Sequence, residues 1–206
     1  MDLPENTALI IIDVQKGFDH PKWGRRNNPD AEEKIAALLK MWRSAGRPVF
    51  YIRHDSLEPN SPLRPELDGN QIKDIVAPLP TEPVISKHVN SSFIGTDLEA
   101  RLRSIGINTL VITGLTTPHC VSTTTRMAGN LVFINYLVSD AKAAFALPSF
   151  DGVVLDAETV HRVSLATLQN EFAQIVRVQD ILDTSDLAPF SNIPLFRPEI
   201  NFRADA

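Results

Sequence analysis

Short, continuous apolar runs alternate with longer amphipathic stretches along most of this chain, and this alternation constrains the fold more than any other feature. The run over residues 7–14 is rich in isoleucine and too short for most helices, so it predicts a strand that is buried on both faces. The predicted strands span 7–14, 48–53, 83–87, 109–113, 133–139 and 175–178.

Helical periodicity fills the intervals between these strands. Asp30 is placed to cap the first predicted helix and Gly46 to end it. Thr96 and Glu99, three residues apart, form the pattern of a capping box. The predicted helices span 31–44, 96–104, 121–131 and 157–172, and the polar, proline-rich loop 55–80 has room for one short helical turn. Strands that alternate with helices of this length imply a parallel sheet covered by helices on both faces.

The composition excludes several classes of protein. A chain of 206 residues suits one domain, because a chain of this size buries roughly 70% of its unfolded surface. The net charge is −5 with no basic stripe, which argues against nucleic acid as a partner. One cysteine permits no internal disulfide, and five scattered histidines form no cluster with metal-ligand spacing. Asp13 within the first apolar run argues against a signal peptide or membrane span, so we expect a cytoplasmic protein.

The last segment differs in composition from the rest of the chain. Residues 183–206 contain three prolines and three phenylalanines without helical or alternating periodicity. A disordered tail would normally have fewer aromatic residues and more charge. We therefore divide the chain into a domain over 1–182 and an extension over 183–206, which we expect to pack on its own core or on a neighbouring subunit.

Three chemically capable residues follow three of the predicted strands. Asp13 ends the first strand, Lys87 ends the third, and Cys120 follows the fourth. In parallel α/β sheets, ligands bind beyond the carboxyl ends of the strands. A thiolate that attacks an amide carbon needs a group that takes the thiol proton and returns it to the leaving nitrogen, and Asp13 is the candidate. The ammonium of Lys87 is placed to favour the charged forms of both partners.

Cys120 has two interpretations. It lies where a β-branched run gives way to a helix-like run, so a helix N-terminus would favour its thiolate and hold an oxyanion. A single free cysteine is, however, more often a small buried hydrophobic residue. The two other residues at strand ends favour the catalytic interpretation.

The motifs around these residues resemble a known family. Asp13-Val14-Gln15 closes the first apolar run, Lys87 follows the third, and the fourth leads into Gly114-Leu115-Thr116-Thr117-Pro118-His119-Cys120-Val121. Over residues 7–178, and in matching order, they are similar to the three signatures of the isochorismatase-like cysteine hydrolase superfamily, which includes nicotinamidases and N-carbamoylsarcosine amidase. The resemblance implies a three-layer Rossmann-like α/β fold whose six-stranded parallel sheet has the order 3-2-1-4-5-6. It also implies a catalytic triad of Asp13, Lys87 and Cys120.

The resemblance implies further features of the site. A non-proline cis peptide bond would join Leu115 to Thr116, and the N–H groups of Thr116 and Cys120 would form the oxyanion hole. Asp13 would deprotonate Cys120, the thiolate would attack, Asp13 would protonate the leaving nitrogen, and water would cleave the thioester. Relatives are commonly dimers or tetramers, so we expect a homo-oligomer that acts on a small molecule.

Two departures from relatives narrow the reaction. Isochorismatases that cleave a vinyl ether resemble this chain but lack the cysteine, so Cys120 favours carbon–nitrogen hydrolysis. Metal-dependent nicotinamidases carry Asp-x-His after the second strand with further histidines nearby, whereas this chain has Tyr51-Ile52-Arg53-His54-Asp55-Ser56. We therefore expect an enzyme without metal or other cofactor, and nicotinamide is not favoured as its substrate.

Position indicates further residues that face substrate, each with a structural role as its alternative, and the resemblance implies the same for Asn90 and Phe93. The candidates for substrate binding are Gln15, Phe18, Trp23, His54, Asn90, Phe93, Thr117 and His119. Arg53 has the same two interpretations, and Phe145 and Phe150 are candidates for a lid or a subunit contact.

Three functions stay open at this point. The first is a metal-independent cysteine amidohydrolase acting on a small amide, carbamoyl or cyclic amide compound. The second is an ether hydrolase of the isochorismatase type, and the third is a catalytically silent member that binds a small ligand. The triad specifies the bond that is broken better than the molecule that carries it.

Overall fold

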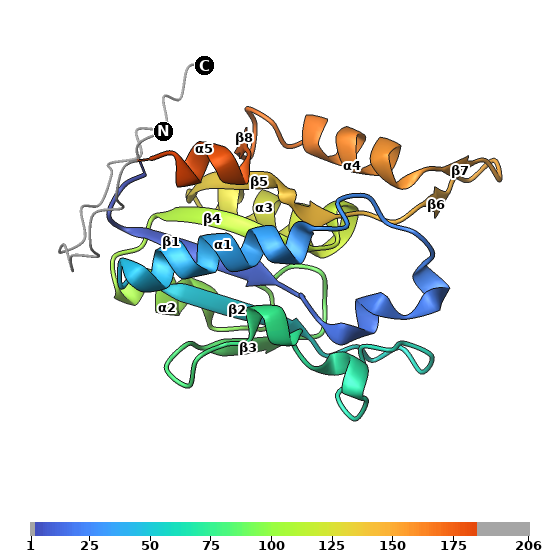
Figure 1. Ribbon diagram of the computed structural model, residues 1–206, viewed down its shortest axis with the longest axis horizontal. Helices are drawn as coiled ribbons and strands as arrows, with labels where there is room; N and C mark the ends of the chain where they lie inside the picture. The colour runs from blue at the N-terminus through green and yellow to red at the C-terminus, as the bar shows by residue number, and fades with distance from the viewer. Residues whose placement is uncertain (1–2, 185–206) are drawn as a thin grey trace, which may run out of the picture.

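Six parallel strands form the central sheet of the computed structural model, which describes residues 3–184 (Figure 1). The strands are β1 (Thr7–Ile12), β2 (Val49–His54), β3 (Val84–Lys87), β4 (Thr109–Leu115), β5 (Ile134–Ala143) and β8 (Gln174–Val176). Their spatial order is β3-β2-β1-β4-β5-β8, so the predicted order is confirmed, with a small hairpin numbered between the last two strands. The order reverses between β1 and β4, and ligands bind at such a switch point.

Helices cover both faces of the sheet, as predicted. Leu9 and Ile11 of β1 pack toward one face, whereas Ile10 and Ile12 pack toward the other. Burial on both faces explains why β1 shows no alternation of polar and apolar residues. The first face is covered by α1 (Ala31–Ser44) and α5 (Val178–Leu182) (Figure 1). The second face is covered by α2 (Leu98–Ser104) and α3 (Ser122–Asn130). The remaining helix, α4 (Ala157–Ala166), lies against β5 and the turn before α3.

A glycine brings the ends of β1 and β4 close together. Gly114 has φ +120°, and a Cβ atom there would lie 2.0 Å from the carbonyl oxygen of Ile12. Only glycine tolerates both this backbone conformation and this approach. The turn after β4 therefore begins directly beside Asp13, which follows Ile12.

Element boundaries differ from the predictions where the backbone turns. β1 ends at residue 12, because Asp13 adopts a left-handed conformation with φ +52° that aspartate tolerates better than most residues. The helix predicted over 157–172 ends at residue 166, and the chain turns at Asn170 with φ +66°. The helix predicted over 121–131 corresponds to α3, and an unpredicted π-helical turn, η5 (Thr117–Val121), precedes it. The strand predicted to reach Val178 ends at residue 176, because Val178 begins the unpredicted helix α5.

The predicted helix caps are only partly correct. Gly46, with φ +62°, ends α1 as predicted. Asp30 precedes α1, but its carboxylate pairs with Lys34 at 3.0 Å and makes no bond to the helix backbone. The capping box predicted at Thr96 is wrong, because α2 begins two residues later and the Thr96 hydroxyl donates to the Ser92 carbonyl at 2.6 Å.

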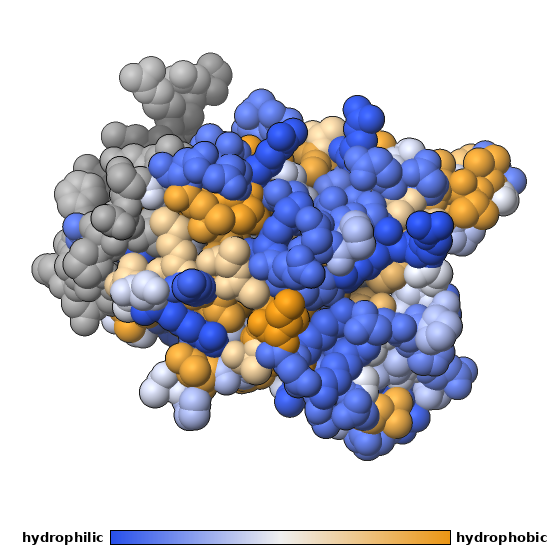
Figure 2. All heavy atoms as spheres, viewed as in Figure 1, coloured by the Kyte–Doolittle hydropathy of each residue, from blue (hydrophilic) through white to orange (hydrophobic). Residues whose placement is uncertain are grey.

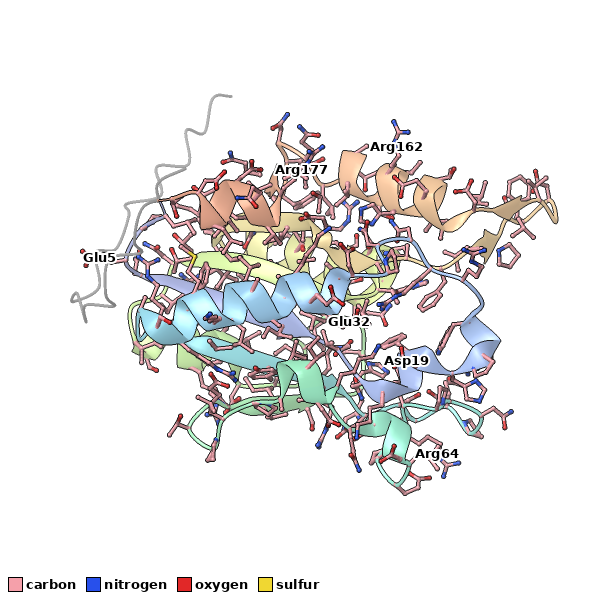
Figure 3. The ribbon with its side chains drawn as sticks, viewed as in Figure 1. Glu5, Asp19, Glu32, Arg64, Arg162 and Arg177 are labelled. Atoms are coloured by element: carbon pink, nitrogen blue, oxygen red, sulfur yellow. The ribbon has the colours of Figure 1, made fainter. Side chains whose placement is uncertain are left out.

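Buried ion pairs anchor the loop that follows β1. This loop carries two 3-10 turns, η1 (Lys16–Asp19) and η2 (Pro21–Trp23). Lys73 Nζ donates to Asp19 at 2.5 Å and to Glu32 at 2.7 Å, and Glu32 also forms an ion pair with Arg26. Asp19 and Glu32 are labelled in Figure 3. Burial would raise the pKa of Glu32, but hydrogen bonds from Arg26 and Lys73 lower it to about 2. These ion pairs connect the loop after β1 to α1 and to the loop 55–80. The loop 55–80 contains two short 3-10 turns, η3 (Asp68–Asn70) and η4 (Asp74–Val76), where one turn was predicted.

An antiparallel hairpin of β6 (Leu147–Pro148) and β7 (Val154–Leu155) projects between β5 and α4, and no strand was predicted there. Phe150 at its tip is fully exposed, and Val154 is 65% exposed. Figure 2 shows an apolar cluster at the right-hand end of the molecule, where Figure 1 places this hairpin.

Within residues 3–184, none of the helices combines the length and the apolar character that crossing a bilayer requires. Most of the Pro/Phe-rich extension predicted over 183–206 lies outside the described residues, so its packing stays a prediction.

Candidate active site

Asp13, Lys87 and Cys120 come together at the carboxyl edge of the sheet. Lys87 Nζ donates to Asp13 Oδ2 at 2.7 Å, and both side chains are completely buried. A carboxylate oxygen of Asp13, a ring nitrogen of His54 and Cys120 Sγ all lie within 4.8 Å of one another. The three residues that sequence position singled out are therefore neighbours in space.

Local backbone structure explains how each side chain reaches this point. Asp13 leaves β1 in its left-handed conformation, and Lys87 is the last residue of β3, in register with His54 of β2. The peptide bond between Leu115 and Thr116 is cis, as the resemblance implied, and it leads into η5, which carries Cys120.

The two oxygens of Asp13 have different surroundings. Oδ2 accepts the bond from Lys87, whereas Oδ1 is buried without a hydrogen-bond partner in the described structure. Burial raises the pKa of Asp13, and the charge and hydrogen bond of Lys87 offset only part of this rise. Asp13 thus has a free oxygen that is more basic than an ordinary carboxylate, next to a thiol.

Cys120 rests as a thiol rather than as the thiolate that the sequence suggested. Burial raises its pKa, and the negative charge of Asp13 raises it further, whereas Lys87 opposes this only in part. Its Sγ–H donates to Asn90 Oδ1 at 3.6 Å. Cys120 also lies inside a five-residue π-helical turn, so the predicted helix N-terminus does not decide its protonation state.

His54 forms the far side of the triad. Its Nδ1 lies 3.1 Å from Lys87 Nζ, so Lys87 contacts Asp13 and His54 together. Burial lowers the pKa of His54 to about 4, and the charge of Lys87 contributes to the decrease. The imidazole is therefore neutral at neutral pH.

A cavity of about 360 Å³ opens onto Cys120. Phe18, Trp23 and Phe145 form an aromatic wall, with ring centroids 5.6 to 6.4 Å apart. The other lining residues are Asp13, Lys22, His54, Leu63, Asn90, Thr116, Pro118, His119, Ala146 and Leu147. Thr116, whose N–H is an expected oxyanion donor, borders the same space as the thiol.

Of the eight predicted substrate-binding residues, the cavity is lined by Phe18, Trp23, His54, Asn90 and His119. The side chain of Gln15 instead bonds the backbone of His54 and Asn70 in the interior. Phe93 stacks on Phe133 beside the core.

Thr117 also lies away from the cavity, and so does Arg53. The Thr117 hydroxyl lies 2.9 Å from His161 Nδ1 in the interior. Arg53 pairs with Asp55 and Ser86. Together with Gln15 and Phe93, these residues have structural roles in place of the substrate contacts that sequence position suggested.

Sequence position missed two buried residues behind the nucleophile turn. His161 of α4 is buried and contacts Thr117, which begins η5. Lys142 of β5 is completely buried, and its Nζ has no hydrogen-bond partner in the described structure. Burial lowers the pKa of Lys142 well below that of an ordinary lysine. A histidine on a helix and a lysine near a strand end look like surface residues in a sequence, and no motif marks them.

The donor atoms of Asp13, His54 and Cys120 are of types that bind metal ions in other proteins. The ammonium of Lys87, however, already lies within hydrogen-bond distance of Asp13 and His54, so a second cation there would meet its charge. The expectation of a metal-independent site stays a prediction.

Comparisons with known proteins agree with this geometry. The isochorismatase family protein YrdC of Bacillus subtilis (strain 168) is 54% identical over 181 residues, which cover 88% of this chain and 97% of YrdC. Ureidoacrylate amidohydrolase RutB of Klebsiella variicola (strain At-22) is 29% identical, with 80% of this chain and 89% of RutB covered. A crystal structure of an isochorismatase-family hydrolase from Chromobacterium violaceum ATCC 12472 superposes with a TM-score of 0.85 at 44% identity, covering 88% of this chain and 95% of that one. The family model of the isochorismatase domain matches residues 7–180, and this chain belongs to the isochorismatase family of hydrolases.

Proposed function

We propose that this protein is a metal-independent cysteine amidohydrolase that cleaves a carbon–nitrogen bond of a small amide, carbamoyl or cyclic amide compound. One observation carries the proposal: a carboxylate oxygen of Asp13 lies within 4.8 Å of Cys120 Sγ, and Asp13 keeps one oxygen without a partner while Lys87 occupies the other. Acyl transfer to a thiol requires a base near the nucleophile that has an oxygen available to take the thiol proton.

The proposed cycle begins with a neutral thiol. When substrate displaces water from the cavity, Asp13 Oδ1 takes the thiol proton as Cys120 Sγ bonds to the amide carbon. Asp13 then donates that proton to the nitrogen as the carbon–nitrogen bond breaks, which leaves a thioester on Cys120. Water, deprotonated by Asp13, cleaves the thioester and restores the thiol. Lys87 holds Asp13 in place and stabilises the carboxylate each time that Asp13 gives up its proton.

The developing oxyanion needs fixed donors in this scheme. We assign this role to the backbone N–H groups of Thr116, which precedes η5, and Cys120, which lies within η5; both residues border the cavity. Removing one such donor from an oxyanion hole typically costs about 3 to 4 kcal/mol of transition-state stabilisation.

The cavity supports a small substrate with an apolar or planar part. Its aromatic wall faces the thiol side, and its size is at the lower end of the range for small-molecule sites. The named activity of RutB, hydrolysis of an amide, agrees with carbon–nitrogen cleavage in this family. The alternative of an ether hydrolase accounts neither for Cys120 nor for the partnerless oxygen of the neighbouring Asp13.

An ammonia-release screen across small amides and ureides tests the proposal, with lactams and imides followed by mass spectrometry because their ring opening releases no ammonia. We expect at least one compound to be hydrolysed by the wild-type protein and not by Cys120→Ala. Hydrolysis that persists in Cys120→Ala would point to the ether-hydrolase type of mechanism. No turnover across the panel, with ligand binding retained, would favour the catalytically silent alternative.

A further inference from the structure

The tautomer of His54 is determined by its neighbour. An ammonium group carries only donors, so His54 Nδ1 accepts the 3.1 Å bond from Lys87. Burial and the charge of Lys87 keep the pKa of His54 at about 4, so the ring is neutral near pH 7. A neutral imidazole has one N–H group, and here it is on Nε2.

This N–H group is available to a ligand. His54 lines the cavity, and in the described structure no hydrogen bond engages its Nε2. A ring nitrogen of His54 lies within 4.8 Å of Asp13, the residue that protonates the leaving nitrogen in the proposed cycle. The imidazole that carries this donor therefore lies close to where the leaving nitrogen must sit.

The other polar groups of the cavity are mainly donors too. Asn90 Oδ1 accepts from the thiol, which leaves the Asn90 amide N–H groups for a ligand. Among the lining residues only Asp13 is an anion. The site thus places a donor at the oxyanion hole, an acceptor at Asp13 and a second donor at His54. The complementary pattern on a ligand is carbonyl, N–H, carbonyl.

We propose that the substrate carries a second carbonyl on its leaving nitrogen, as in an imide or an acylurea, and that this carbonyl accepts a hydrogen bond from His54 Nε2–H. The inference rests on the proposed amidohydrolase function and names its substrate class. Sγ bonds to the first carbonyl carbon, the carbon–nitrogen bond breaks, and the proton from Asp13 converts the nitrogen to a carboxamide NH₂. The second carbonyl withdraws electrons from the nitrogen and makes it a better leaving group than an amine.

Two ligands of nearly equal size test this recognition without turnover. Succinimide and 2-pyrrolidinone share a five-membered ring and differ by one carbonyl. We expect Cys120→Ala to bind succinimide about tenfold more tightly, measured by NMR titration, because one additional hydrogen bond is worth about a factor of ten. Equal affinities would overturn the inference.

Variants at His54 identify the source of the preference. In the Cys120→Ala background, His54→Leu removes the donor, and we expect the two affinities to become equal. His88→Gln is the matched control, because His88 lies outside the cavity and bonds the Asp55 carbonyl; we expect it to keep the preference. A preference that survives in folded His54→Leu would overturn the inference. If His54→Leu does not fold, the ligand pair in Cys120→Ala still decides, as does His54→Gln, whose side chain keeps a donor and an acceptor and should retain a preference.

Failure of the inference and failure of the proposed function have different signatures. Cys120-dependent hydrolysis of simple amides with no preference for imides would overturn the substrate class and keep the amidohydrolase function. A His54-dependent preference for succinimide without hydrolysis of any imide would support the recognition and contradict the proposed catalysis.

Discussion

At the scale of single residues, Asp13 is the centre of the proposed chemistry because its two oxygens are engaged differently. Lys87 fixes one oxygen, and the other is buried beside the thiol without a partner. Burial raises the pKa of both Asp13 and Cys120, which favours the neutral thiol, whereas the ammonium of Lys87, 2.7 Å from Asp13 Oδ2, favours the carboxylate. Proton transfer between them must accompany attack on the substrate.

Replacing Asp13 by asparagine should separate this role from a structural one. We expect turnover to fall about 10²- to 10⁴-fold, the usual contribution of general acid–base catalysis. Alkylation of Cys120 by iodoacetamide at pH 7 should become slower, because the base that takes the thiol proton is gone while burial still holds the thiol pKa high. Intact-mass spectrometry measures alkylation of the single cysteine. Asp74→Asn, at an exposed position, is the control, and alkylation that is as fast in Asp13→Asn as in the wild type would contradict this account.

Lys142 is a second residue-scale feature, because a buried amine without a partner destabilises the fold. We expect Lys142→Met to raise the free energy of unfolding by about 1 to 3 kcal/mol at pH 7. In the folded state burial lowers the pKa of Lys142, whereas the unfolded chain keeps the ordinary value of 10.5. The unfolded state therefore binds an extra proton below pH 10.5, and the stability of the wild type rises with pH toward that value.

Urea unfolding at pH 7 and pH 10 measures the effect of Lys142→Met. The advantage of the variant should shrink at the higher pH, because the unfolded wild type then gains less from protonation. Lys40→Met, at an exposed position of α1, should change stability little at either pH. A variant that is less stable than the wild type at pH 7 would mean that the amine has a stabilising partner.

At the scale of elements, α4 supports the turn that carries the nucleophile. Thr117 and His161 join η5 to α4 through one buried hydrogen bond of 2.9 Å. Burial lowers the pKa of His161 to about 4, so the ring is neutral and its Nδ1 can accept from the hydroxyl near pH 7. The bond restrains the first residue of the π-helical turn, three residues before Cys120.

Thr117→Val should loosen this turn while keeping the shape of the side chain. We expect about a tenfold decrease in kcat with KM nearly unchanged, because Thr117 does not line the cavity. Thr117→Ser should restore the rate, since it keeps the hydroxyl. Ser164→Ala is the control, because it removes a hydrogen bond of α4 that does not involve η5. Equal kcat in Thr117→Val and the wild type would contradict a positioning role.

The elements that sequence predicts well are those with strong hydrophobic periodicity. β1 and α1 could be placed because both faces of β1 are buried and α1 has a clear apolar stripe. The β6–β7 hairpin could not, because each strand has only two residues and its tip is apolar and exposed. The π-helical turn η5, which precedes the predicted helix 121–131, could not be placed either, because a local hydrophobic pattern does not distinguish such a turn from a loop.

The candidate site could be predicted from sequence where a chemically capable residue stands at the carboxyl end of a strand. Asp13, Lys87 and Cys120 follow this rule, and the sheet order brings them together. Gln15 follows it as well, yet its amide bonds the backbone, because orientation beyond a strand end depends on the loop that packs there.

At the scale of the whole molecule, the apolar hairpin is the surface feature that most needs a partner. Phe150 and Val154 are exposed next to α4, where Val163 is 59% exposed. We expect this surface to contact a second copy of the chain, in agreement with the predicted homo-oligomer. Light scattering should give a multiple of 22.8 kDa for the wild type and a smaller mass for Phe150→Ser/Val154→Ser. A monomeric wild type would contradict the prediction.

The whole molecule serves to hold one thiol, one free carboxylate oxygen and one donor-lined cavity at the switch point of the sheet. Intact-mass spectrometry during turnover, quenched in acid, tests this account most directly, because the chain has a single cysteine. With a compound that the protein hydrolyses, we predict a transient mass increase equal to the acyl group on Cys120, and neither the increase nor turnover in Cys120→Ser. Undiminished turnover in Cys120→Ser, with no acyl adduct on the wild type, would contradict the central claim.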